Sequence, residues 1–271
     1  MIDFEYHAPT SLDQVFGLLE QYGDDCRIMA GGTALVIQMK QRLSQPSHVI
    51  GLRNVENLNS IESTPEGVRI GGLCTQRQIE NSILIGEDLP LLTDTFRKVA
   101  TPRIRNMATI GGGLVNGDPN QDPPPALIAL GASAFMTSSS GDRVVPLEDF
   151  FIDYYETDVQ PGEVMTSVLV PRAPVGSGSV YLKFLPRTAD DYGTVSVASV
   201  VSKKQDGTCK DVRIVLGSAG VTPIRAKDAE DALRGKPLTD ENIRAAAALV
   251  KDVVDPLEDF RGSAEYKTDM S

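Results

Sequence analysis

Apolar residues recur at helical spacing near the start of the chain, and short apolar runs flank them. Leu12, Val15, Phe16, Leu19 and Tyr22 fall on one face of a helix. Ser11 with Gln14 forms a capping box before it, and Gly23 marks its end. Further apolar runs predict strands over 4–9, 27–30 and 49–52, and a helix over 34–40. These elements predict a first small unit of mixed strands and helices.

Two stretches of different composition divide the remaining pattern. A polar stretch covers 54–65, and a stretch rich in Gly, Ser and Pro covers 173–179. Between them the pattern predicts strands over 68–73 and 164–170, a hairpin of 134–137 with 143–146, and helices from Thr75 (capping box with Gln78) to 85, over 89–99 and over 126–130. After the second stretch, the pattern predicts strands over 180–185, 195–202 and 212–218, then helices over 226–233 and 240–254. We therefore expect an α+β chain with units 1–57, 58–172 and 173–271.

Two glycine-rich segments carry the candidate chemistry. The first runs from Ile28 through Gly31-Gly32 to Thr33, and the second holds Gly111 to Gly113 after Thr109. Backbone amides stand uncovered where side chains are missing, so they can cradle a phosphate without a lysine. Two such segments indicate a ligand with more than one phosphate. We expect the chain to turn at both segments, and an ordinary tight turn without a ligand remains the alternative for the first.

Composition excludes several classes of function. The chain has 271 residues and a formal net charge of −11, with no basic patch, which argues against nucleic acid as a partner. No apolar run reaches the roughly 20 residues of a membrane span. The first residues lack the basic and apolar regions of a signal peptide, so we expect no leader and a cytoplasmic protein.

Metal and nucleophile chemistry finds little support in the residue pattern. Cys26, Cys74 and Cys209 are far apart, form no zinc or iron–sulfur array, and are interpreted as separate thiols. His7 and His48 are the only histidines, and no spacing around them supports a metal site or a catalytic triad. We therefore expect no metal in this chain and no catalytic residue of the acid–base kind.

Charged residues flank the second glycine segment. Asp122 follows it and precedes three prolines, which we expect to hold the chain extended before the helix at 126–130. In a nucleotide site, such a carboxylate suits ribose hydroxyls or an adenine amine, whereas a turn or helix-cap role is the alternative. Arg103 and Arg105 precede the segment and either offset phosphate charge or form solvated or ion-paired side chains.

Longer motifs resemble the FAD-binding subunit of the molybdenum hydroxylases, the family of xanthine dehydrogenase and carbon monoxide dehydrogenase. The opening FEYHAPTSLDQVFGLLEQYG, the two glycine segments MAGGTALVIQMK and VATPRIRNMATIGGGLVNGDPNQDPPPALIALGA, and the later YLKFLPRTADDYGTVSVA and RGSAEYK carry this resemblance. It implies a vanillyl-alcohol-oxidase (PCMH)-type fold. Two α+β subdomains would hold an extended FAD, and a C-terminal domain of sheet and helices would cover the isoalloxazine.

The resemblance also implies roles for individual residues. The diphosphate would lie between two groups, namely Ala30, Gly31, Gly32, Thr33, Ala34 and Leu35 on one side, and Thr109, Gly112, Gly113 and Asn116 on the other. The remaining positions would be Asp122 at the ribitol or ribose hydroxyls, Leu169 and Lys183 at the adenine or flavin end, Val99 and Ala100 along the flavin, and Tyr192 near the isoalloxazine face. A solvated Lys183, a plain core Tyr192 and an ordinary turn at Asp190 and Asp191 remain the alternatives.

The function that the resemblance implies is electron transfer. A large molybdenum-cofactor subunit would hydroxylate a substrate, and a small subunit would relay electrons through two [2Fe–2S] clusters to the FAD of this chain, in an (αβγ)₂ assembly. The external acceptor would be NAD, a quinone, a cytochrome or oxygen. A stand-alone FAD-dependent oxidoreductase of the same fold is the alternative, and it would need its own substrate pocket and proton donor.

Overall fold

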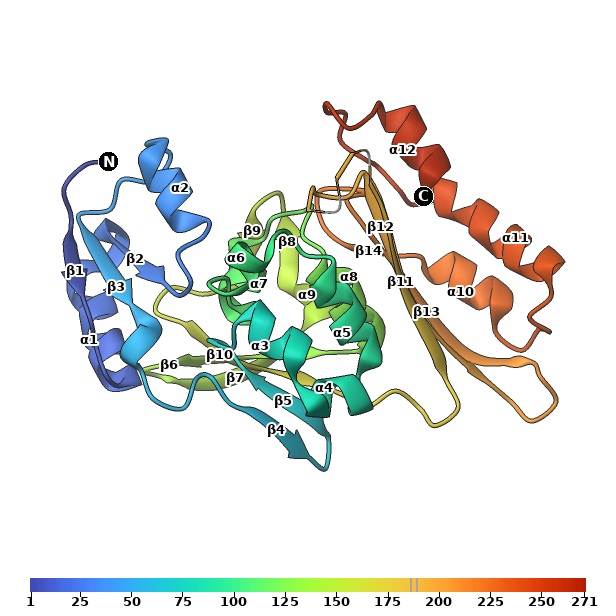
Figure 1. Cartoon of the computed structure of the whole chain (residues 1–271), viewed down its shortest axis with the longest axis horizontal. Helices are drawn as coiled ribbons and strands as arrows, with labels where there is room; N and C mark the ends of the chain where they lie inside the picture. Colours follow the sequence, from blue (N-terminus) through green and yellow to red (C-terminus); the bar gives the residue numbers. More distant parts are fainter. Residues whose placement is uncertain (186, 189) are drawn as a thin grey trace.

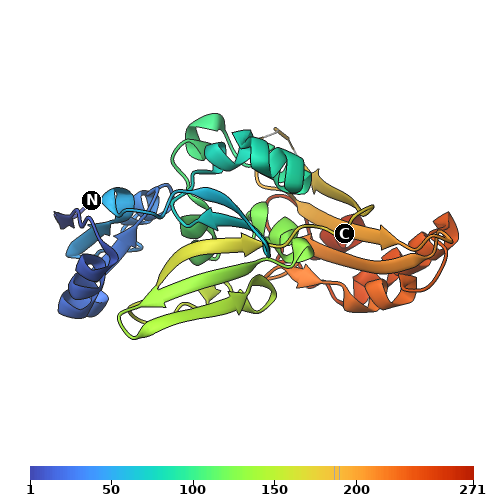
Figure 2. The same cartoon turned by 90° about the horizontal axis from the view of Figure 1, so that it is seen from below.

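The computed structural model describes residues 1–185, 187–188 and 190–271, so Pro186 and Ala189 of the YLKFLPRTADDYGTVSVA motif lie outside the described residues. Helices and strands are mixed throughout, and Figure 2 shows the sheets following one another along the long axis. This arrangement confirms the α+β class.

The N-terminal part is a three-stranded parallel sheet with one covering helix (Figure 1). Its elements are β1 (Glu5–His7), α1 (Leu12–Tyr22), η1 (Gly23–Asp25), β2 (Cys26–Met29), α2 (Leu35–Lys40), β3 (His48–Gly51) and η2 (Leu52–Asn54), with strand order β1-β3-β2. Val15 of α1 packs on Ile50 of β3 in a small separate core. Ser11 caps α1 as expected, but the Gln14 side chain accepts from the amide of Thr10 instead of completing a capping box.

The central part is a five-stranded antiparallel sheet, ordered β4-β5-β10-β6-β7, with helices packed on it. Its strands are β4 (Ile61–Thr64), β5 (Gly67–Gly71), β6 (Ser133–Ser138), β7 (Gly141–Pro146), the short pair β8 (Phe151–Asp153) and β9 (Glu156–Thr157), and β10 (Val164–Val170). Its helices are α3 (Gln76–Asn81), α4 (Ile83–Asp88), α5 (Pro90–Arg97), α6 (Pro102–Arg105), α7 (Ile110–Asn116), α8 (Pro123–Leu130) and α9 (Leu147–Phe150).

The C-terminal part is a four-stranded antiparallel sheet between two layers of helices. Its elements are β11 (Gly178–Phe184), β12 (Val195–Lys203), β13 (Cys209–Gly217), β14 (Ile224–Arg225), α10 (Lys227–Leu233), α11 (Asp240–Ala248), η3 (Leu249–Asp252) and α12 (Ala264–Met270). Helices α10 and α11 cover one face, and α5 and α8 of the central part lie on the other (Figure 1). Tyr181 and Val215 therefore belong to the same core as Phe96 and Leu127.

Several local predictions were wrong, and each error has a physical reason. The prolines after Asp122 form the first turn of α8, where their missing N–H groups lack an intrahelical partner anyway. The three consecutive glycines lie inside helix α7 rather than in a turn, because Thr109 caps that helix. The helix from Thr75 divides at Ser82, which caps α4. Strand β4 lies in the polar stretch 54–65, which we interpreted as a boundary between units, and α12 was not predicted.

The three cysteines are free and buried, which confirms their interpretation as separate thiols. In the described part of the chain, no helix combines the length and the apolar character needed to cross a membrane.

Candidate functional site

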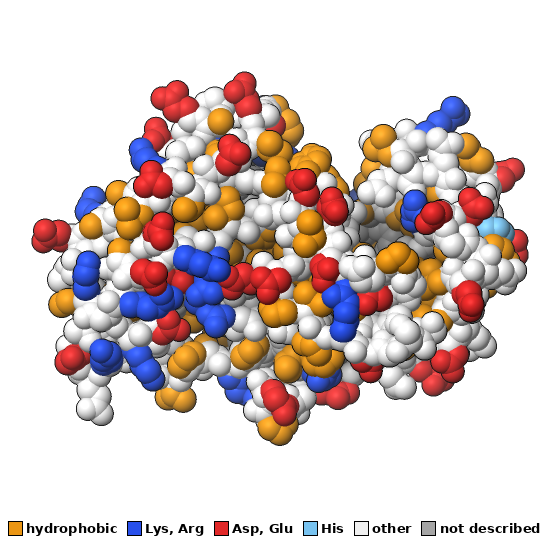
Figure 3. Space-filling view, turned by 180° about the vertical axis from the view of Figure 1, so that it is seen from behind, with side chains coloured by type: hydrophobic (Ala, Val, Ile, Leu, Met, Phe, Trp, Pro, Cys, Tyr) orange, Lys and Arg blue, Asp and Glu red, His pale blue; other side chains and the backbone are white. Residues whose placement is uncertain are grey.

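A cavity of about 970 Å³ lies between the N-terminal sheet and the helices of the central part. Figure 3 shows the hollow between these two lobes from behind. Its size is at the upper end of the roughly 300–1,000 Å³ that proteins use for small-molecule ligands. Both glycine segments line it, together with residues 190–192 that follow β11.

The first glycine segment presents unused backbone donors to this cavity. Within the described residues, the amides of Gly32, Thr33 and Ala34 donate no hydrogen bond to the chain, and no side chain caps α2. Gly32 has a φ of 71°, which favours glycine. A side chain at Gly31 would place its Cβ only 1.9 Å from the carbonyl oxygen of Met107. The two glycine segments therefore pack backbone to backbone at this point.

The second glycine segment offers the first turn of α7 to the same cavity. The Thr109 hydroxyl accepts a hydrogen bond from the amide of Gly112 at 3.1 Å. A Cβ on Gly112 would come within 2.9 Å of that hydroxyl oxygen and 3.3 Å of Ala30 Cβ. The Asn116 side chain accepts from Gln38 of α2 at 3.4 Å, which links the two walls. The structure thus brings both groups of predicted diphosphate residues into one cavity.

Two glutamines behind Gly113 have buried polar atoms without partners. Gln76 Oε1 and Gln121 Nε2 make no hydrogen bond within the described chain, and both residues line the cavity. Buried polar atoms are nearly always hydrogen-bonded, so these two indicate a polar ligand that completes them. A Cβ on Gly113 would lie 3.5 Å from Gln121 Oε1 and 3.9 Å from Gln76 Nε2, which is ordinary contact.

Asp122 belongs to a buried charged cluster at the cavity wall. Its Oδ1 accepts from the Tyr181 hydroxyl at 2.6 Å, and its Oδ2 accepts from Lys183 Nζ at 2.9 Å. Lys183 also donates to the carbonyl of Lys98 at 2.9 Å, and its side chain is 1% exposed. Burial raises the pKa of the Asp122 carboxyl, whereas the Lys183 ammonium opposes that shift. Lys183 is therefore not a solvated strand residue, and both Asp122 oxygens already have protein donors.

A second buried ion pair supports the wall at Val99 and Ala100. Arg105 donates to Glu80 Oε2 at 2.9 Å and to the carbonyls of Val99 and Ala100 at 2.6 and 2.9 Å. Ala100 has a φ of 38°, a strained value for alanine, and the guanidinium holds it there. This settles the alternative for Arg105: it is an ion-paired structural residue and does not line the cavity, and neither does the exposed Arg103.

Tyr192 closes the cavity at the C-terminal part. Its hydroxyl donates to Asp118 Oδ2 at 2.9 Å, and the Arg261 guanidinium lies 5.4 Å from its ring centre. Burial and the Asp118 carboxylate raise the pKa of the Tyr192 hydroxyl well above its usual value, so it stays protonated. Arg261, the first residue of the RGSAEYK motif, reaches the site through this contact, and it pairs with Asp259 at 2.5 Å. Tyr192 is 45% exposed and is not a core residue.

The predicted residues differ in how they meet the cavity. All of them line it except Leu169 and Lys183. Leu169 lies within β10, paired with Arg69 and Ser133, and Lys183 lies behind Asp122. Asp190 and Asp191 line the cavity, and the Asp191 amide donates to the Thr188 carbonyl as in a turn.

Sequence reasoning missed several lining residues. Gln76, Asp118, Gln121 and Tyr155 are the polar ones that matter most. Gln76 looks like an ordinary helix residue after the Thr75 cap, and Tyr155 like a loop aromatic. Only Asp118 and Gln121 had a signal, since both stand inside the second glycine motif.

Comparisons with known proteins agree with this geometry. Residues 2–173 match the family model described as the FAD binding domain in molybdopterin dehydrogenase. Residues 180–271 match the CO dehydrogenase flavoprotein C-terminal domain. The chain is 36% identical over 268 residues to the carbon monoxide dehydrogenase medium chain of Hydrogenophaga pseudoflava, covering 99% of this chain and 93% of that protein. It is 33% identical over 267 residues to the 6-hydroxypseudooxynicotine dehydrogenase complex subunit alpha of Paenarthrobacter nicotinovorans, covering 98% of this chain and 90% of that protein.

Solved structures show the same relationship. Carbon monoxide dehydrogenase from Hydrogenophaga pseudoflava, in a form lacking the Mo-pyranopterin moiety, matches with a TM-score of 0.96 and 38% identity over 100% of this chain and 94% of that one. Quinoline 2-oxidoreductase from Pseudomonas putida 86 matches with a TM-score of 0.91 and 30% identity over 99% and 92% of the two chains. Together with the cavity between two glycine segments, these matches establish that the chain belongs to the FAD-binding medium subunits of the molybdenum hydroxylases.

Proposed function

We propose that this chain is the electron-transfer subunit of a heterotrimeric molybdenum hydroxylase, in which the bound FAD takes electrons from the [2Fe–2S] clusters of a small partner and gives them to an external acceptor. A large partner would carry the molybdenum cofactor, and the assembly would be (αβγ)₂. The acceptor would be NAD, a quinone, a cytochrome or oxygen. A cytoplasmic location also stays a prediction, as does the division after residues 57 and 172, although each proposed unit holds one of the three larger sheets.

The single observation that carries this proposal is the cavity, which has unused backbone donors on the wall formed by the first glycine segment. The free amides at Gly32, Thr33 and Ala34 suit one side of a diphosphate. The amides of 110–113 already donate to Cys74, Gly72 and Thr109, so the second segment would meet the diphosphate with the N-terminal end of α7 and with backbone that carries no side chains. The unpartnered Gln76 and Gln121 atoms fit the polar groups of the same ligand. The residues present therefore fit FAD.

The redox chemistry belongs to the flavin, and the chain supplies binding, orientation and electrostatics. Val99 and Ala100 would contact the flavin from a wall that Arg105 holds rigid. Tyr192 would cover the isoalloxazine end, with its hydroxyl fixed by Asp118. Asp122 lines the cavity, and its two oxygens, held by Tyr181 and Lys183, would accept from ribitol or ribose hydroxyls with their remaining lone pairs. Leu169 has no contact with the cavity that supports its proposed role.

Purification from the native host tests the assembly. We expect flavin absorbance together with the broad absorbance of iron–sulfur clusters and two co-purifying chains. A lone chain that carries flavin and turns over a substrate by itself would instead establish the stand-alone oxidoreductase.

A charge placed at Gly113 tests the diphosphate site. Gly113→Asp and Gly113→Asn add side chains of nearly equal size where a Cβ has room, but only the first adds a negative charge. At a separation of a few ångström, repulsion of about 3–4 kcal/mol weakens FAD binding by about 100-fold or more. We expect Gly113→Asp to lose most of its FAD while Gly113→Asn keeps more, as measured by flavin absorbance per chain.

Gly17→Asp serves as the charge control, because Gly17 lies on exposed α1 with nothing within 4 Å of its Cβ position. Equal FAD content in Gly113→Asp and Gly113→Asn would mean that the second glycine segment does not face the diphosphate.

A further inference from the structure

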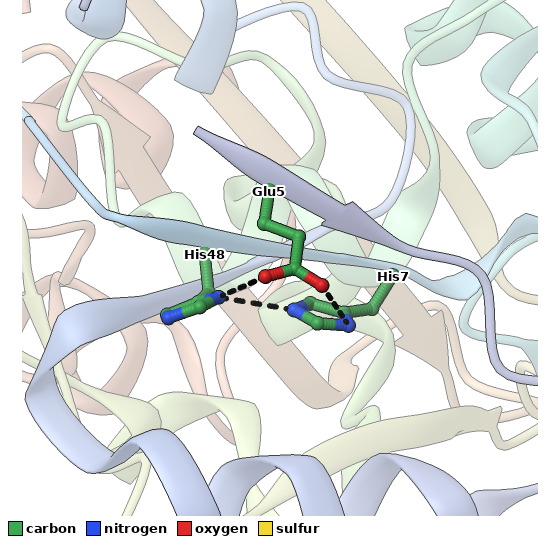
Figure 4. A group of neighbouring side chains, drawn as sticks. All are labelled: Glu5, His7 and His48. Carbon is green, nitrogen blue, oxygen red and sulfur yellow. Dashed lines mark hydrogen bonds and ion pairs between the residues drawn. The ribbon is translucent and has the colours of Figure 1, made fainter. Parts of the chain in front are cut away.

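The only two histidines of the chain lie together on the N-terminal sheet, beside an acidic side chain (Figure 4). The sequence separates His7 and His48 by 41 positions, but β1 pairs with β3 in parallel and the register sets Glu5 beside His48. Side chains two residues apart on a strand point to the same face, so Glu5, His7 and His48 converge. None of them lines the FAD cavity.

Two of the three separations among these side chains are close to those of a metal-ligand set. His7 Nε2 lies 3.1 Å from His48 Nδ1, and His48 Nδ1 lies 3.6 Å from Glu5 Oε2. One ligand atom from each residue falls within 4.8 Å of the others. Zinc bonds of about 2.0–2.1 Å in tetrahedral geometry place neighbouring ligand atoms roughly 3.3 Å apart. Small side-chain adjustments therefore suffice to surround one ion.

The two imidazole rings are held in place before any ion binds. The Tyr22 ring stacks on His48 with centres 3.7 Å apart and on His7 with centres 5.1 Å apart. The histidine side chains are 14% and 20% exposed, whereas the Glu5 side chain is 65% exposed. An ion would thus enter from solvent past Glu5 and meet nitrogens whose orientation is already set, which reduces the entropy lost on binding.

From this geometry we propose a second, cofactor-independent site in this chain, a mononuclear site for a divalent transition-metal ion of the zinc class. His7 Nε2, His48 Nδ1 and a Glu5 carboxylate oxygen are its protein ligands, with water in the remaining position. Imidazole and carboxylate ligands together suit Zn²⁺, Ni²⁺ and Cu²⁺. A hydrogen bond between the two facing nitrogens uses the lone pair of only one of them, whereas an ion accepts lone pairs from both.

The site would serve a structural purpose, judged by the elements it joins. A bound ion ties β1 to β3, and β3 also pairs with β2, the strand that leads into the first glycine segment. Cys26 of β2 lies beside His48 in the register, but its thiol donates to the Gly23 carbonyl at 3.2 Å and is not a ligand.

Titration of the tag-free, FAD-containing chain with Co²⁺ tests the proposal. Co²⁺ replaces zinc and gives visible bands at longer wavelengths than flavin absorbs. We expect one Co²⁺ per chain, displaced by Zn²⁺, with His48→Ala and His7→Gln weakening the affinity about 100-fold or more and Glu5→Gln about tenfold. Glu62→Gln, on exposed β4, is the matched control and should bind like the unaltered chain.

Flavin absorbance distinguishes loss of the metal site from loss of FAD, since we expect the Glu5, His7 and His48 variants to keep their flavin. If His48→Ala fails to fold, Glu5→Gln still tests the site because Glu5 is largely exposed. The proposal is wrong if the unaltered chain gives no cobalt band, or if Glu5→Gln and His7→Gln bind Co²⁺ as tightly as it does.

Discussion

Removing the Asp122 carboxylate should lower the free energy of unfolding more than replacing an uncharged side chain at the cavity wall. In Asp122→Ala, the Lys183 ammonium would remain 1% exposed with only the Lys98 carbonyl as a partner, and the Tyr181 hydroxyl would lose its acceptor. Breaking a buried ion pair from one side costs about 3–5 kcal/mol. Since domains are stable by roughly 5–15 kcal/mol, this loss is a large share of the total. Urea unfolding of the purified chain, followed by circular dichroism, measures it.

Two companion variants divide this loss between charge and packing. Lys183→Met should cost less than Asp122→Ala, because burial already raises the pKa of Asp122 and the carboxyl can take a proton. The double variant Asp122→Leu with Lys183→Met should recover much of the loss, since apolar replacement of a buried pair is often neutral. The reasoning is refuted if Asp122→Ala loses less than about 1 kcal/mol, or if the effects of the two sites simply add.

Two further predictions concern the walls of the cavity. Gly31→Ala would drive its Cβ against the Met107 carbonyl, so we expect it to lose about 1–3 kcal/mol of stability and most of its FAD, whereas Gly17→Ala should lose neither. Unchanged urea midpoint and flavin content in Gly31→Ala would contradict the close packing of the two glycine segments. Burial alone would raise the pKa of Glu80, but hydrogen bonds from Arg77 and Arg105 lower it on balance. Its contribution to stability is therefore complete above the unfolded-state pKa of about 4.3 and is lost as the pH falls through the lower folded-state value. Flavin fluorescence should report release of FAD in that acid range, and Glu80→Gln, which lacks the titrating group, should show a weaker dependence on pH there.

Local signals in the sequence predicted the elements whose residues decide their own structure. Helix α1 has an apolar face and a Ser11 cap, and the glycine segments can be recognised from their consecutive glycines. The prediction was wrong where tertiary contacts decide. We predicted that the three prolines after Asp122 are extended, but they begin α8, because the first turn of a helix tolerates residues without an N–H donor. Gln76 becomes a site residue because the start of α3 pairs with the chain before α7, where its amide donates to the Ala108 carbonyl, and Gln121 because the chain between α7 and α8 returns to the cavity; no spacing in the sequence indicates either contact.

Because the hydrophobic cores are divided unevenly, bound FAD would link the N-terminal part to the rest of the chain. The core around Val15 and Ile50 lies mostly in the N-terminal part and includes Leu58 and Val164 of the central part, whereas the central and C-terminal parts share a larger core that includes Phe96 and Tyr181. An extended ligand that contacts both walls of the cavity spans the boundary between the N-terminal and central parts. At a concentration 100 times its dissociation constant, such a ligand adds about 2.7 kcal/mol to the stability of the form that binds it. Flavin content therefore sets how firmly the first fifty residues stay docked, and protease cleavage within them should slow as the chain fills with FAD.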